Sequence, residues 1–216
     1  QLHRIVAENT WLFGEEFNLM VDDRSLTECL RQHAKARKSQ LIIDAPVKHP
    51  TKARGIVDLM LSKQRRLHRV SDVEHLVVEL KAPTVPIGRK ELTQIEEYAQ
   101  AVVTDGRFDI VNTKWRFWAL SNEVDDVAIS MRQIPNAPEG TVVDSNGLTI
   151  VVRRWGQVIS ENKARLQFFQ ERLNHNVDKV AALKHLRERY ETILSTTVTD
   201  EAIEAASTAA AEAGNI

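Results

Sequence analysis

The sequence predicts an α/β or α+β domain built on a mixed sheet, and three observations support this fold class. Helical patterns and short apolar runs of strand character follow one another along the 216 residues. Hydrophobic residues make up 43% and charged residues 27%, which is ordinary for a globular chain. This length is enough to bury a core without disulfide bonds.

The pattern of the first 82 residues predicts two helices and three strands. The first helix ends within residues 2–7, and Gly14 is a plausible break after it. The second helix, over residues 24–38, is amphipathic and has Ser25 as its expected N-cap. The strands are rich in branched apolar residues and are expected at residues 40–46, 54–62 and 74–82.

The remainder contains the clearest helix of the sequence, over residues 89–103. Its apolar residues recur at steps of three and four: Leu92, Ile95, Ala99 and Val102. Two more strands and two more helices are expected after it, at residues 114–122, 148–159, 161–173 and 177–194. Residues 196–216 lack aromatic side chains and read as a frayed helix or a disordered end.

Charged residues inside two of the predicted strands need an explanation. Glu79 and Lys81 interrupt an apolar strand and share one of its faces, because they are two residues apart. Asp58 lies in the preceding strand, and the basic residues 63–72 between them are short enough for an antiparallel hairpin. A symmetric hairpin sets Asp58 opposite roughly residue 77, and one small register shift brings it beside Glu79. Directly opposed side chains are about 5 Å apart.

Two carboxylates and an ammonium group at that range suit phosphoryl chemistry. Carboxylate oxygens bind Mg²⁺ or Mn²⁺, which can activate water and offset phosphate charge. Lys81 would then orient the water or stabilise developing charge. Taken singly, each residue has a simpler interpretation: Asp58 as a salt-bridged strand-edge carboxylate, and Glu79 with Lys81 as a solvated ion pair.

These residues resemble the PD-(D/E)xK nuclease superfamily, in the segments GIVD at 55–58 and VVELK at 77–81. The next predicted helix contains QIEEYA, with Gln94 and Tyr98, as in RecB-like branches. The resemblance implies a restriction-endonuclease-like mixed sheet flanked by helices, with a C-terminal helical extension. It implies that the catalytic residues are Asp58, Glu79, Lys81 and Gln94, with Tyr98 as a supporting residue. It also implies that Asp58 and Glu79 bind Mg²⁺ or Mn²⁺.

A closer resemblance is to Shedu-type anti-phage defence nuclease domains, carried by LHRIVAENTWLFGEEF at residues 2–17. Such domains place a further metal-binding glutamate on the first helix. Glu8 is the candidate, unless that glutamate precedes residue 1; Glu15 and Glu16 are further candidates. The resemblance implies a cytoplasmic nuclease that acts on DNA in anti-phage defence and forms homo-oligomers.

Basic residues near Asp58 are candidates for contact with a nucleic-acid backbone. They are Lys48, Lys52, Arg54, Arg65 and Arg66, with Arg153 and Arg154 as weaker candidates. Arg65 and Arg66 belong to the basic stretch at residues 63–69. A solvated hairpin tip explains that stretch equally well. The four tryptophans and Cys29 are expected in the core, and the histidines show no metal-binding spacing. A single cysteine excludes an intramolecular disulfide and a cysteine-rich zinc site.

The expected organisation is a nuclease-like domain over residues 1–174, followed by a helix and flexible tail over 175–216. Since the first residue is Gln1, we expect a fragment of a longer protein with an N-terminal regulatory region. No run of apolar residues is long enough for a membrane span. The predicted function is metal-dependent hydrolysis of DNA; the alternative is an inactive binding or oligomerisation module of a larger defence or repair protein.

Overall fold

The computed structural model describes residues 2–51, 55–64, 73–130, 132–145, 147–173 and 179–190. The chain divides into two compact units, Leu2–Asn162 and the part that begins at Lys163. The candidate site lies entirely in the first unit. In the second unit the structure describes the C-terminal part of one helix and a further helix, α6 (Lys179–Arg189).

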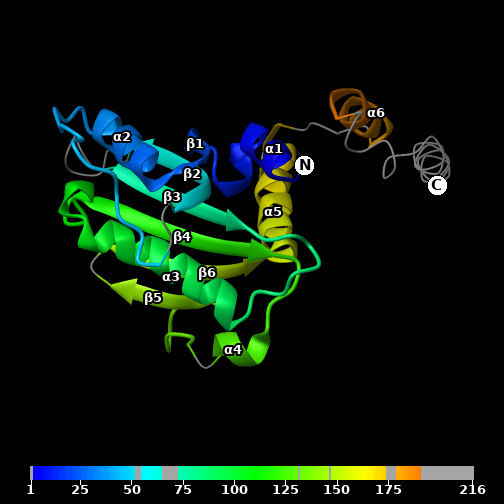
Figure 1. Ribbon diagram of the computed structural model, residues 1–216. Helices are drawn as coiled ribbons and strands as arrows, with labels where there is room; N and C mark the ends of the chain where they lie inside the picture. Colours follow the sequence, from blue (N-terminus) through cyan, green and yellow to red (C-terminus); the bar gives the residue numbers. More distant parts are fainter. Residues whose placement is uncertain are drawn as a thin grey trace, which may run out of the picture. The chain divides into compact units, whose positions relative to one another are not determined.

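A six-stranded sheet forms the centre of the first unit (Figure 1). Its strands are β1 (Asn18–Ser25), β2 (Ile56–Gln64), β3 (Val73–Leu80), β4 (Thr113–Ser121), β5 (Thr141–Ser145) and β6 (Leu148–Arg154). They are arranged in the order β1-β2-β3-β4-β6-β5. β3 runs parallel to β4, and β4 runs parallel to β6, whereas the other pairs are antiparallel. The predicted mixed sheet is therefore confirmed, and it is compatible with a restriction-endonuclease-like fold.

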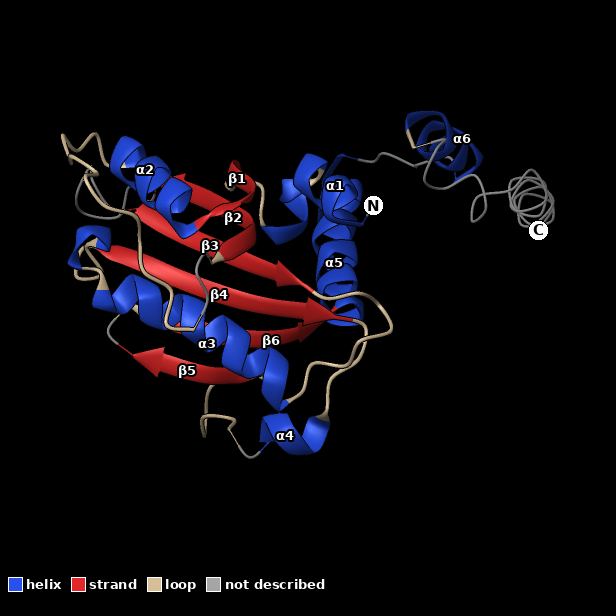
Figure 2. Ribbon diagram, in the orientation of Figure 1, coloured by secondary structure: helices blue, strands red, loops and turns tan. Residues whose placement is uncertain are grey.

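Helices cover both faces of this sheet (Figure 2). One apolar cluster joins α2 (Leu26–Ala36) and α3 (Arg89–Thr104) to the first face, called here the α3 face. The other joins α1 (Leu2–Glu8), the short helix η1 (Thr10–Phe13) and the start of α5 (Trp155–Leu173) to the α1 face. β3 is buried along nearly its whole length, as expected for a central strand covered on both faces, and it buries the polar residues Glu74, His75 and Glu79 together with its apolar ones.

Local capping explains where the two helices of the α3 face begin. Ser25 Oγ accepts a hydrogen bond from the backbone N–H of Glu28, which confirms the predicted N-cap of α2. At the start of α3 the side chain of Glu91 accepts from the backbone N–H of Gly88 at 3.1 Å. The α3 helix follows the loop after β3, and its apolar residues pack against the sheet.

Several predicted elements differ from the structure. Residues 40–46 form no strand, and Ile42 is 82% exposed. Strands β1 and β5, with the short helices η2 (Gly106–Phe108) and α4 (Asp126–Ser130), were not predicted. The strand expected over residues 148–159 ends at Arg154, and α5 begins at the next residue. The strand prediction at residues 40–46 rested on apolar composition alone and was wrong. β1 was not predicted because its charged residues give it no apolar composition.

The core expectations hold with one exception. Cys29 and Trp115 are buried, and Trp118 and Trp155 pack against the core, but Trp11 is 40% exposed. The indole N–H of Trp11 donates instead to the side chain of Asn9 in the same turn, so this tryptophan serves local structure at the surface.

A pair of buried histidines lies beside Trp115 on the α3 face. His33 Nδ1 and His75 Nε2 are 2.9 Å apart, and both rings contact the indole. Burial lowers the pKa of His33 to about 4 and lowers the pKa of His75 well below its ordinary value. Both rings are therefore neutral at physiological pH, as the expectation of structural histidines requires.

Candidate active site

The register of β2 and β3 brings Asp58 close to the end of β3. The pairing runs as far as Leu59 facing Val78, and the same register continued by one residue sets Asp58 level with Glu79. The hairpin is thus shifted from the symmetric alignment by the small step that the sequence interpretation required. The two carboxylates come from neighbouring strands. Glu79 shares the α3 face with Val77, and Asp58 lies between Val57 of the α3-face core and Leu59 of the α1-face core.

Glu79 is the centre of a closed polar network. The residue is 5% exposed. Its Oε1 accepts from Lys81 Nζ at 3.0 Å and from Gln94 Nε2 at 2.5 Å. Lys81 Nζ also donates to Gln94 Oε1 at 2.8 Å, which closes a three-membered ring of hydrogen bonds. The ring fixes the direction of the ammonium group, and the third N–H of Lys81 remains available for a ligand.

Backbone contacts hold the members of this ring in place. The N–H of Lys81 donates to the carbonyl of Leu120 on β4, which continues the parallel pairing beyond the end of β3. Gln94 lies in the first half of α3, one turn before Tyr98. The loop between β3 and α3 therefore brings a strand end and a helix start together, and this is why the ring forms.

The side chain of Tyr98 connects the hydrogen-bonded ring to β2. Its side chain is buried, and its hydroxyl donates to the carbonyl of Ile56 at 2.5 Å and accepts from Gln94 at 3.4 Å. Burial, with a smaller effect of the Glu79 charge, raises the pKa of Tyr98 to about 12. The phenol therefore stays protonated and ties α3 to the beginning of β2, the strand that carries Asp58.

The side chain of Asp58 is half-buried. Its Oδ2 accepts from the backbone N–H of Leu80 at 2.6 Å. Burial raises the pKa of this carboxyl, and the Leu80 hydrogen bond with the charges of His3 and Lys81 opposes the rise in part. A charged Asp58 is therefore destabilised by its surroundings, and a cation at this position would offset the cost.

The oxygen donors at this site come from two carboxylates, Asp58 and Glu79. Among the described residues, no group of three or more histidine, cysteine, aspartate or glutamate side chains converges as a metal site. Two neighbouring carboxylates are nevertheless the kind of set that Mg²⁺ uses, because this ion keeps several waters and takes further oxygens from a phosphate substrate. Asp58 and Glu79 therefore fit Mg²⁺ or Mn²⁺ as a partial, oxygen-only site.

Glu8 does not join Asp58 and Glu79 in such a group. It is at the end of α1, which packs on the opposite face of the sheet, and its side chain accepts from Arg4 at 3.3 Å in an exposed ion pair. The further candidates Glu15 and Glu16 are exposed on the turn before β1.

The contact of α1 with the site was missed in the sequence. His3 Nε2 lies 2.8 Å from the carbonyl oxygen of Asp58 and 2.9 Å from a carboxylate oxygen of Asp22 on β1. Since both neighbours accept hydrogen bonds, this nitrogen carries the proton. No spacing in the sequence relates residue 3 to residue 58, and only the folded sheet brings them together.

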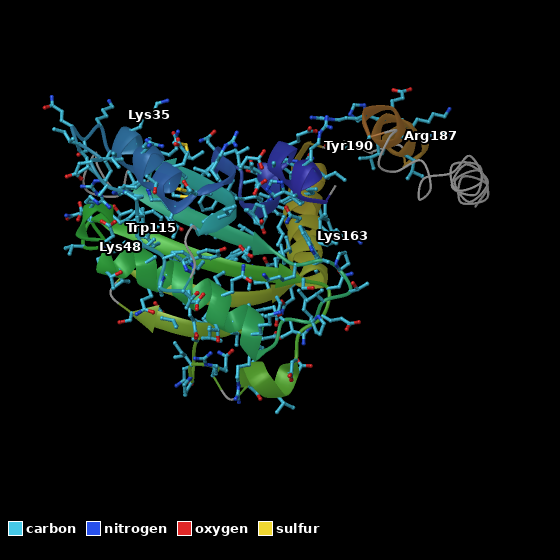
Figure 3. The ribbon with its side chains drawn as sticks, viewed as in Figure 1. Lys35, Lys48, Trp115, Lys163, Arg187 and Tyr190 are labelled. Atoms are coloured by element: carbon cyan, nitrogen blue, oxygen red, sulfur yellow. The ribbon has the colours of Figure 1, made fainter. Side chains whose placement is uncertain are left out.

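The basic candidates divide into two groups. Lys48 is exposed on the segment that joins α2 to β2 (Figure 3). Lys52, Arg54, Arg65 and Arg66 lie outside the described residues. Arg153 and Arg154 are each engaged in ion pairs, with Glu161 and with Asp126 respectively.

Two cavities of the first unit lie away from this site. Their volumes are about 520 Å³ and 670 Å³, they are lined by residues of β6 and its surroundings, and neither includes Asp58, Glu79 or Lys81. The helices of the described part include none that is long and apolar enough to cross a membrane.

Comparisons with known proteins give one finding. No protein-family model and no curated protein matches the chain. A solved structure of a repair endonuclease from Pyrococcus abyssi aligns with a TM-score of 0.37 and 14% identity. The alignment covers 71% of this chain and 45% of that chain, so this chain spans less than half the length of the endonuclease.

Proposed function

We propose that this protein is a metal-dependent nuclease that hydrolyses phosphodiester bonds, with DNA as its substrate. One observation carries the proposal: Lys81 and Gln94 form a hydrogen-bonded ring with Glu79, and Asp58 of the neighbouring strand accepts from the backbone N–H of Leu80, the residue next to Glu79. Two carboxylates beside an oriented ammonium group are suited to a phosphate diester and poorly suited to an uncharged substrate.

In this proposal Asp58 and Glu79 hold Mg²⁺ or Mn²⁺, which would supply positive charge against the phosphate and lower the pKa of water. Lys81 uses its remaining N–H to hold a phosphate oxygen or the attacking water. Gln94 acts through Lys81 and Glu79, so it is a positioning residue. In the reaction, the water oxygen forms a bond to phosphorus, the bond to one ester oxygen breaks, and that oxygen leaves with a proton.

The biological setting of the proposal is anti-phage defence in the cytoplasm, with the protein acting as a homo-oligomer. Its basis is the resemblance of residues 2–17 and 55–98 to Shedu-type domains. The exposed Leu186 on α6 is available for contact with a second copy. Lys48 and the basic residues on either side of β2 would contact the DNA backbone.

A second candidate function is favoured by the small number of acidic ligands in the described part of the chain. With only two carboxylates, the domain would bind DNA or link subunits without cleaving. The two functions differ in whether a divalent cation binds and whether phosphodiester bonds break.

The test is incubation with supercoiled plasmid in Mg²⁺ and then in Mn²⁺. Glu79→Gln and Lys81→Ala are compared with Lys114→Ala, a matched control on an exposed lysine of β4. The proposal expects nicking that both site variants reduce by roughly 100-fold or more and that the control retains. Cleavage that survives both site variants would refute the assignment, and binding of DNA without cleavage in any form would support the second candidate.

A further inference from the structure

The cavity of about 670 Å³ lies on the α1 face of the sheet, over the neighbouring strands β4, β6 and β5 (Figure 1). The residues of β4 on either side of Arg116 belong to the core of the α3 face, so Arg116 and Trp118 project from the opposite face. Arg116 faces Thr149 and Trp118 faces Val151 of β6, and all four residues line the cavity.

A buried carboxylate fixes the guanidinium group of Arg116. Glu74 on β3 is fully buried, and one of its carboxylate oxygens lies 2.9 Å from Arg116 Nε. Lys63 Nζ lies 3.7 Å from the same oxygen and is a second cation beside it. Because a buried charge is costly unless it is paired, Glu74 holds the guanidinium in one place.

The ion pair with Glu74 uses Nε and leaves the two Nη groups of Arg116. Within the described ranges no acceptor contacts these Nη groups, and the Arg116 side chain is 43% exposed. A guanidinium held along one edge presents parallel N–H donors, which match the oxygens of a phosphate group bidentately. Arg116 is therefore arranged in advance for an oxyanion, and binding costs little side-chain entropy.

The rest of the cavity lining has charges of both signs. Arg153 lies over the indole ring of Trp118, at 4.7 Å from the ring centroid, and is ion-paired with Glu161. Glu139 and Asp144 also line the cavity. These carboxylates repel a long polyanion such as a DNA strand, whereas a compact ligand with one anionic group and several N–H donors satisfies both signs of charge.

The size of the cavity and its apolar surface narrow the class of ligand further. Sites for small molecules have volumes of about 300–1,000 Å³, and this cavity is within that range. A nucleoside monophosphate joins one phosphate group to a flat base with N–H donors. Trp118 and Val151 provide apolar surface for a base, and the carboxylates can accept from its N–H groups.

We propose that this cavity binds a free nucleoside monophosphate, with its phosphate held by Arg116 and its base against Trp118 and Val151. None of the residues in the candidate active site lines the cavity. The inference therefore goes beyond the proposed nuclease activity and does not depend on it.

The experiment is calorimetric titration of AMP, GMP, CMP and UMP into the full chain, with the corresponding nucleosides and inorganic phosphate as comparison ligands. Arg116→Gln removes the fork of N–H donors, and Arg116→Lys keeps the charge without the fork. Thr149→Glu leaves the ion pair of Arg116 with Glu74 intact and puts a carboxylate opposite the guanidinium, so it tests the site even if the Arg116 variants fold poorly. Arg31→Gln is the matched control, because Arg31 is also an exposed arginine paired with a glutamate, on α2. Thermal melting checks that each variant is folded.

We expect at least one of the nucleotides to bind more tightly than about 1 mM, with no measurable binding of its nucleoside. Arg116→Gln and Thr149→Glu should weaken this binding roughly 10-fold or more, and Arg116→Lys by less, whereas Arg31→Gln keeps the wild-type affinity. Absence of binding of all four nucleotides, or wild-type affinity in both Arg116→Gln and Thr149→Glu, would overturn the inference. Inorganic phosphate that binds as tightly as the nucleotide would also overturn it, because the cavity would then recognise an anion alone.

Discussion

Replacement of Gln94 by leucine tests whether the hydrogen-bonded ring around Glu79 positions Lys81, the lysine proposed to act in catalysis. Leucine has a similar volume and can neither donate to Glu79 nor accept from Lys81, and both of these contacts involve charged partners. Each hydrogen bond to a charged group contributes about 1.5–3 kcal/mol, and burial of the leucine side chain offsets part of the loss. We expect a net destabilisation of about 2 kcal/mol.

For a chain of this length, that loss lowers the melting temperature by roughly 4–8 °C. In a plasmid-cleavage assay, kcat should fall roughly 10-fold to 100-fold while KM for DNA changes little, because Lys81 loses its orientation but not its charge. Thermal melting and steady-state cleavage at several DNA concentrations measure the two effects. Gln100→Leu, at an exposed position of the same helix, is the control and should change neither quantity.

Two results would refute this reasoning. An unchanged melting temperature would mean that the ring does not form in solution. A lower melting temperature with wild-type kcat would mean that Gln94 stabilises α3 without positioning Lys81.

Three further predictions follow from the fold. The pKa of His33 is depressed to about 4, so the unfolded chain binds more protons than the native one between pH 6.5 and 4, and His33 should lower the stability over that window by on the order of 3 kcal/mol. Melting curves of His33→Leu should show a weaker pH dependence, with the part due to His75 retained, whereas the exposed His185→Asn control keeps all of it. Gly140 has a φ of 80°, and a Cβ there would lie 2.1 Å from the carbonyl oxygen of Val152, so Gly140→Ala should cost at least about 2 kcal/mol in denaturant unfolding; a wild-type midpoint would contradict it. If α6 mediates assembly, Leu186→Glu, at a position 42% exposed, should reduce the mass measured by light scattering, and an unchanged mass would exclude this residue from the interface.

Most of the site was predictable because its members are close in sequence. Glu79 and Lys81 are two residues apart, and Gln94 and Tyr98 are one helical turn apart, so local geometry fixes their shared faces. Asp58 required only the assumption of a hairpin, which the structure confirms with a register shifted by the expected small step. That these residues perform catalysis stays a prediction.

Contacts between distant segments were not predictable in the same way. His3 meets the backbone carbonyl of Asp58 across 55 residues, and Asp22 on β1 pairs with Leu59 on β2 across the whole of α2. β1 was missed because its many charged residues hide its strand character, and the strand expected at 40–46 was wrong because apolar residues there lie on an exposed connection. Glu8 was placed by resemblance, and α1 carries it to the opposite face.

The sequence by itself determined the local components: the apolar stripe of α3, the N-cap at Ser25, and the alternation that puts Glu79 and Lys81 on one face. These follow from helix and strand periodicity, which acts over a few residues. Only the tertiary structure decided that His3 lies beside both the carbonyl of Asp58 and the carboxylate of Asp22. Strand order and register depend on how both faces of the sheet pack. The sequence of a single strand does not specify which strand it pairs with.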